Sequence, residues 1–179
     1  MRFILFLVAL ALGVSVFVAV HFVDFPGSVP DFENITGGAV LLDMKPSFSQ
    51  DEVYGRLAAY GEAGRKNYAF RNKTVDVLLP IGMLPILFLS MNAAIRKLEP
   101  FRVWRIVLLS VPFAYVIFDF GENAAVLAML AHYPERLPLV AGILPYLTII
   151  KRVSSMLALF GPPVIFGLVF LRARRISRA

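Results

Sequence analysis

The chain contains no cysteine and only two histidines among its 179 residues. The first absence excludes disulfide bonds, thiol–disulfide exchange, thiolate catalysis and metal sites built on cysteine. The histidines, His21 and His132, are expected at the outer ends of helices, where they could not ligate a haem between facing helices. We therefore expect neither a metal site nor a cofactor.

Charged residues are scarce as well. They make up 17% of the chain, whereas hydrophobic residues make up 59% and the mean hydropathy is +0.75. A typical soluble domain has about 25% charged and about 45–50% apolar residues. A chain of this size could not hide so much apolar surface from water. The composition therefore predicts an all-α integral membrane protein, in which a four-helix bundle is completed by the bilayer.

Four apolar stretches define the predicted spans of this single membrane domain, at 3–20, 75–95, 106–131 and 153–171. About twenty apolar residues are needed to cross a hydrocarbon core of about 30 Å. The first stretch could be a signal peptide, but Phe17 and Ala19 do not fit the small-x-small cleavage pattern, which favours a retained anchor. A further apolar stretch at 137–150 precedes the fourth span.

The basic residues predict the orientation. Lysine and arginine gather in the loop at 94–105 and in the C-terminal tail, as Arg96, Lys97, Arg102, Arg105, Arg172, Arg174, Arg175 and Arg178. By the positive-inside rule both termini are expected in the cytoplasm, and residues 21–73 are expected to form a small extracytoplasmic cap. We expect the protein in a bacterial inner membrane. The net charge of +6 thus reflects topology. Nucleic-acid binding is not expected, because no folded basic surface with stacking aromatics is indicated.

The cap is expected to be mostly loop before residue 49, with a short strand at 39–42. Ser49 and Glu52 form a capping box that predicts a helix over 49–60, and Gly61 and Gly64 should break or bend it. Residues 65–71 then run into the second span. Arg65 and Tyr68 lie three residues apart on one helical face and are candidates to contact lipid headgroups.

A polar cluster interrupts the third span, where Asp119, Glu122 and Asn123 share one helical face. A carboxylate in hydrocarbon costs about 2.5–3.5 kcal/mol on insertion scales, so such residues are rarely without a role. The connection at 132–136 is short, so the third and fourth spans should form an antiparallel pair that brings Lys151 level with Asp119. The same register places Thr148 beside Glu122 and Arg152 one step away. The predicted cluster, in the outer half of the bilayer, consists of Asp76, Asp119, Glu122, Asn123, Lys151 and Arg152.

This cluster supports three functional hypotheses. The favoured one is a non-enzymatic membrane component that binds membrane lipid, or packs with another membrane protein or a second copy of itself. The alternative is a membrane-embedded enzyme that acts on a lipid or isoprenoid substrate, with Asp119 and Glu122 as acid and base. The third is a proton- or ion-coupled carrier, which with four spans would have to act as an oligomer.

Several short motifs between residues 40 and 135 carry a family resemblance. They are Leu41-Leu42-Asp43, the run Tyr60-Gly61-Glu62-Ala63-Gly64-Arg65-Lys66-Asn67-Tyr68, Asp76 with Pro80, and Asp119-Phe120-Gly121-Glu122-Asn123. In these the chain resembles uncharacterised small four-span bacterial integral membrane proteins. The resemblance implies a fold of four membrane helices and implies no activity.

Overall fold

The computed structural model describes residues 2–98 and 101–176, and within these ranges it is all-helical, without a β-strand. The helices are α1 (Arg2–Phe22), α2 (Val29–Thr36), α3 (Gln50–Ala59), α4 (Gly61–Lys73), α5 (Val75–Leu98), α6 (Arg102–His132) and α7 (Pro138–Ile176). The predicted class, an all-α helical bundle, is confirmed.

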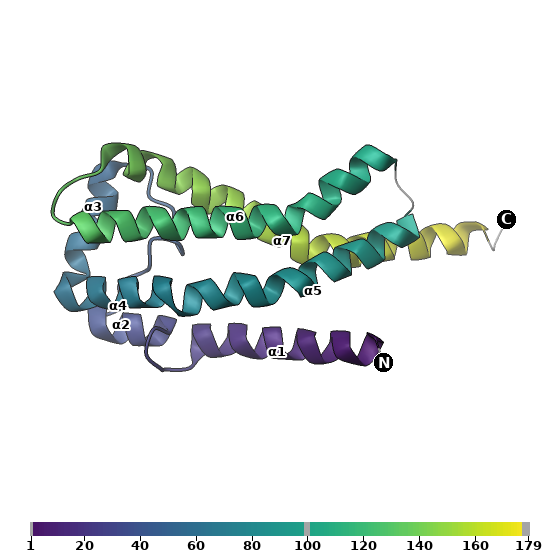
Figure 1. Cartoon of the computed structure of the whole chain (residues 1–179), viewed down its shortest axis with the longest axis horizontal. Coiled ribbons are helices and arrows are strands. Elements are labelled where there is room, and N and C mark those ends of the chain that lie inside the picture. The colour runs from purple at the N-terminus through teal and green to yellow at the C-terminus, as the bar shows by residue number, and fades with distance from the viewer. Residues whose placement is uncertain (1, 99–100, 177–179) are drawn as a thin grey trace.

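The long helices α1, α5, α6 and α7 run along the length of the molecule, and the short helices α2, α3 and α4 gather at one end (Figure 1). Both chain termini lie toward the opposite end, as do the C-terminal end of α5 and the N-terminal end of α6. The helices α6 and α7 form the antiparallel hairpin that the short connection predicted. The cap and the two termini therefore lie at opposite ends of the bundle.

Three helices are long and apolar enough to cross a membrane, namely Gly61–Leu98, Arg102–His132 and Pro138–Arg172. The first of these joins α4 to α5 across Thr74. In α1 the described apolar stretch, Leu10–Phe22, is shorter, so the predicted first span at 3–20 stays a prediction.

The predicted fourth span lies within a longer helix. α7 is one helix from Pro138 to Ile176, so it includes the apolar stretch at 137–150 as well as the predicted span at 153–171. Proline is favoured in the first turn of a helix, where its missing N–H is not needed. The helix continues through Lys151 and Arg152, because Lys151 pairs with Glu122 of α6 and Arg152 donates to the carbonyl of Asp43.

The predicted strand at 39–42 was wrong. The carbonyl groups of Val40 and Leu41 accept hydrogen bonds from Arg56, at 2.9 and 2.8 Å, and Val40 also accepts one from Tyr60 at 2.7 Å. Side chains of α3 and its C-terminal turn thus take the place of a strand partner. The side chain of Leu42 is buried in the core of the cap.

Local sequence explains the cap helices. Ser28 and Ser49 cap the N-termini of α2 and α3, each accepting a bond from the backbone N–H three residues on. Gly37, with a φ of 69°, ends α2, and Gly61, with a φ of 65°, turns the chain from α3 into α4. The helix predicted over 49–60 is thereby confirmed.

The core of the cap extends into the bundle. Buried side chains from α2, the loop at 37–49, α3 and α4 form one cluster with side chains from the adjoining ends of α6 and α7, including Phe32, Leu57, Tyr68, Val126, Met129 and Leu144. The last turns of α6 and the first turns of α7 therefore pack against the cap. This packing holds the cap against the end of the bundle, next to the polar residues described below.

Candidate functional site, a polar cavity beneath the cap

The polar residues of α6 and α7 meet as their spacing predicted. The Lys151 ammonium forms ion pairs with Glu122 and, at 3.6 Å, with Asp119. The Thr148 hydroxyl donates a hydrogen bond to the Glu122 carboxylate, and the Asn123 amide donates one to Asp119 at 3.4 Å. Glu122 is fully buried, so its charge depends on Lys151 and Thr148 for compensation.

A second ion pair joins α4 to α5. The Arg71 guanidinium lies 2.8 Å from Oδ1 of Asp76 and donates a 2.9 Å hydrogen bond to the carbonyl of Gly27. Both charged residues are buried, with Arg71 2% and Asp76 9% exposed. The other carboxylate oxygen of Asp76, Oδ2, has no hydrogen-bond partner among the described residues.

The loop before α3 contributes a third carboxylate, that of Asp43. The Tyr68 hydroxyl donates to Asp43 Oδ1 at 2.8 Å, and the Arg152 guanidinium donates to the backbone carbonyls of Asp43, at 3.2 Å, and Met44. Burial acts to raise the pKa of Asp43, but the positive charges of Lys151 and Arg71 and the bond from Tyr68 outweigh it and lower the pKa below its ordinary value. Asp43 therefore stays ionised at neutral pH.

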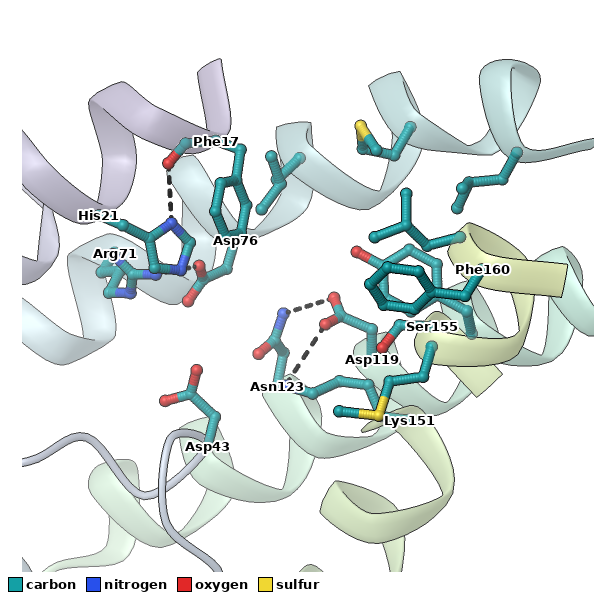
Figure 2. A pocket seen from close by; sticks show the side chains of 16 residues that line it. Phe17, His21, Asp43, Arg71, Asp76, Asp119, Asn123, Lys151, Ser155 and Phe160 are labelled. Atoms are coloured by element: carbon teal, nitrogen blue, oxygen red, sulfur yellow. Dashed lines mark hydrogen bonds and ion pairs between the residues drawn. The ribbon is translucent and has the colours of Figure 1, made fainter. Parts of the chain in front are cut away.

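These groups surround one cavity of about 370 Å³, lined by residues of α1, α4, α5, α6, α7 and the loop. Figure 2 shows Asp43, Asp76 and Asn123 pointing from three elements toward a common space, whereas Phe160 lies on the other side. His21 also lines the cavity, and its Nδ1 lies 2.8 Å from the carbonyl of Phe17. The cavity is thus charged on one side and apolar on the other.

A second cavity, of about 490 Å³, continues the apolar side. It lies between α1, α5 and α7, and it shares Met83, Leu87 and Leu159 with the polar cavity. Its other lining residues are almost all apolar: Leu10, Ile86, Leu89, Ser90, Ala93, Ala158, Pro162, Pro163 and Phe166. We call this second cavity the apolar groove. The two cavities therefore adjoin at these three side chains, and one is lined largely by charged and polar groups while the other is lined by hydrocarbon side chains.

Four of the six residues of the predicted polar cluster line the cavity, and two do not. Asp76, Asp119, Asn123 and Lys151 line the polar cavity. Glu122 lies behind it in the α6–α7 contact, and Arg152 holds the loop in place.

The two predicted headgroup contacts lie elsewhere. The Arg65 guanidinium lies 4.0 Å from the centre of the Tyr133 ring and donates to the carbonyl of Leu57 at 3.0 Å. Tyr68 is fully buried, and its hydroxyl faces Asp43. Both side chains therefore serve the cap and its loop in this structure.

Two charged residues of the cavity were absent from the predicted site, Asp43 and Arg71. Asp43 lies in an irregular segment, far in sequence from every group that it approaches. Arg71 is one of several basic residues in α4, and only its position one turn before the apolar run distinguishes it. The nearby acidic Asp76 was the signal that could have identified it, since a buried carboxylate needs a cation within reach.

No group of His, Asp and Glu residues suited to a metal ion occurs within the described ranges. The fold and the site define a helical protein with three candidate membrane spans and an amphiphilic cavity. Comparison with protein-family models, with curated proteins and with solved structures finds no match to this chain.

Proposed function

We propose that this chain is a non-enzymatic integral membrane protein that binds an amphiphilic molecule from the bilayer. The polar head of the ligand occupies the polar cavity, and its apolar chain lies in the apolar groove. The observation that carries this proposal is that the two cavities adjoin, since Met83, Leu87 and Leu159 line both. Ligand sites are typically apolar clefts with a few convergent polar groups, which describes this pair of cavities.

Helix lengths support a membrane boundary at the polar layer. From Arg102 to Asp119, α6 extends about 26 Å along its axis, and from Asp76 to Lys97, α5 extends about 32 Å. Both lengths match a hydrocarbon core of about 30 Å. The cavity then lies just inside the outer boundary, where headgroups meet acyl chains. The basic end of the bundle faces the cytoplasm in this arrangement, and a bacterial inner membrane is the proposed location.

The exposed surface of α6 agrees with this boundary. Its exposed large apolar side chains all precede Asp119, and they are Val103, Trp104, Ile106, Val107, Phe113 and Ile117. Exposed apolar surface of this extent is typical of contact with a membrane or a partner. On α7 exposed apolar side chains also occur on the N-terminal side of Lys151, as far as Leu139. The exposed surface of α7 therefore does not indicate where the outer membrane boundary lies.

The geometry favours binding over acid–base catalysis. Of the two carboxylates in the enzyme hypothesis, Asp119 lines the cavity, but Glu122 is 0% exposed and engaged by Lys151 and Thr148. A general acid or base must come within hydrogen-bond reach of the proton that it transfers. Glu122 could do so only after leaving its present partners.

A photoactivatable probe can test the proposal. The purified protein, reconstituted in lipid nanodiscs, is exposed to a fatty amphiphile that carries a diazirine in its alkyl chain. After illumination, mass spectrometry should locate the adducts on groove residues of α5 and α7. Ser90→Phe places a ring in the groove and should lower this labelling about tenfold, the change expected when a fit worth about 1.4 kcal/mol is lost.

Ser110→Phe is the matched control. Ser90 and Ser110 both bond a carbonyl of their own helix, but Ser110 is exposed on α6 and lines neither cavity. Labelling of this variant should equal that of the wild type. Labelling spread evenly over all exposed apolar surfaces, or equal in both variants, would overturn the proposal.

A further inference from the structure

We propose that the head of the bound amphiphile is a protonated amine. This inference rests on the proposed function, since it concerns the chemistry of the ligand in the same cavity. It follows from three features of the site: an excess of carboxylates, the prior engagement of the cations, and an unpaired buried acceptor.

Carboxylates outnumber cations around the cavity. Three carboxylates line it, those of Asp43, Asp76 and Asp119. The described cationic side chains that line it are Arg71 and Lys151. An added cation would balance this excess, whereas an added anion would increase the repulsion. This difference between a cation and an anion is larger in a site of low dielectric than in water.

The two cations already have acidic partners. Lys151 contacts both Asp119 and Glu122, and Arg71 contacts Asp76. Arg152, the other predicted anion ligand, donates to the carbonyls of the loop. An anionic head would have to separate one of these pairs, and a buried carboxylate stranded in this way is costly.

The unpaired acceptor is Oδ2 of Asp76, in a residue that is 9% exposed and lines the cavity. A buried acceptor without a donor is costly, and a donor supplied by a ligand removes that cost. Asp43 and Asn123 face the same space (Figure 2). An ammonium group offers three N–H donors, which suits acceptors that converge from three directions.

This geometry distinguishes a primary amine from other cations. A quaternary ammonium has no N–H group and would leave Asp76 Oδ2 unpaired. A metal ion needs ligands gathered at short distances, and the described carboxylates form no such group. Nε of Arg71 also lacks an acceptor among the described residues, and a hydroxyl or ester oxygen next to the amine would supply one.

Three competitors with the same alkyl chain test the inference: dodecylamine, dodecyltrimethylammonium and dodecanoate. Each is titrated at neutral pH against the photoactivatable amphiphile bound to the wild-type protein in nanodiscs. Dodecylamine should compete at a concentration at least about tenfold lower than the other two. Tenfold corresponds to about 1.4 kcal/mol, the least that a hydrogen bond to a charged group is expected to contribute. Equal competition by all three would overturn the amine head and leave the proposed function standing. A lack of competition by every one would overturn both.

Variants locate the preference. Asp76→Asn keeps an acceptor for Arg71 but removes the charge and the free acceptor. The lost charge weakens both cations alike, whereas the lost acceptor affects only the amine, so the advantage of dodecylamine over dodecyltrimethylammonium should disappear. The control is Asp51→Asn, since Asp51 is an exposed residue of α3 paired with Arg136 on the surface. It should behave as the wild type. If Asp76→Asn does not fold, Asp43→Asn is measured in its place, and a preference for dodecylamine that survives there contradicts the assignment.

Discussion

At the scale of single residues, Lys151 compensates the charges of the two buried carboxylates of α6. Its ammonium group is shared by Asp119 and Glu122, and its side chain is 14% exposed. Removing one member of a buried ion pair strands the charge of the other, whereas replacing both members together is far less harmful. The contribution of the pair is therefore visible only when single and double variants are compared.

We expect Lys151→Met to lower the free energy of unfolding by about 3–5 kcal/mol, because it leaves the buried Glu122 without its cation. Adding Glu122→Gln should recover part of the loss. Denaturant titration of the detergent-purified protein, followed by circular dichroism, measures both variants. A double-mutant cycle without coupling would show that the pair is not an energetic unit.

The surface supplies a control for this prediction. Lys66 and Glu62 form an ion pair at 2.6 Å on α4, but both side chains are about three-quarters exposed. Exposed pairs contribute about 0–1 kcal/mol, so Lys66→Met should change stability by less than about 1 kcal/mol. Equal losses at positions 66 and 151 would mean that burial does not explain the effect.

At the scale of elements, α2 and α4 pack so closely that one position tolerates no side chain. A Cβ atom on Gly64 would lie 2.4 Å from Cγ2 of Thr36 in α2 and 3.1 Å from Cβ of Tyr60. Gly55, in the exposed face of α3, has open space around it. The two helical glycines therefore differ in packing while sharing the same backbone propensity.

The same substitution should consequently have opposite effects at these glycines. Gly64→Ala should destabilise the protein by about 1–3 kcal/mol, the cost of overpacking a close contact. Gly55→Ala should stabilise it by about 0.5–1 kcal/mol, because alanine is the better helix former. Thermal denaturation of the two variants beside the wild type checks both signs. Stabilisation by Gly64→Ala would show that α2 does not approach α4 as closely as described.

Local rules account for much of what the sequence predicted at this scale. The capping box at Ser49 located α3, and the short connection between α6 and α7 fixed which residues lie level, so Lys151 was correctly placed beside Asp119. The loop at 37–49 follows no periodic rule. Its position depends on Arg56, Tyr68 and Arg152, which are distant from it in sequence. The sequence therefore could not predict that Asp43 lines the cavity, or that residues 39–42 form no strand.

At the scale of the whole molecule, the polar layer separates two environments. Beyond it, the ends of α6 and α7 pack with the cap into one core, which includes Val126 and Leu144. On the other side, α6 presents exposed apolar side chains toward its basic end. In the proposed arrangement the amphiphilic cavity lies at this transition, where a membrane lipid would change from headgroup to acyl chain. A boundary there would account for the charges, the cavity and the lengths of α5 and α6.

This arrangement predicts which parts of the chain are reached from each side of the membrane. The chain lacks cysteine, so single cysteines can be labelled without background. Glu52 is exposed in the cap, and Lys97 and Arg172 are exposed toward the basic end of the bundle. Glu52→Cys should react with a membrane-impermeant maleimide on intact cells, whereas Lys97→Cys and Arg172→Cys should react only after permeabilisation, because the positive-inside rule places the basic end in the cytoplasm.

The unsubstituted chain is the control and should stay unlabelled throughout. Labelling of positions 97 and 172 but not 52 on intact cells would reverse the proposed orientation, and labelling of both 52 and 97 would show that α5 does not cross the bilayer.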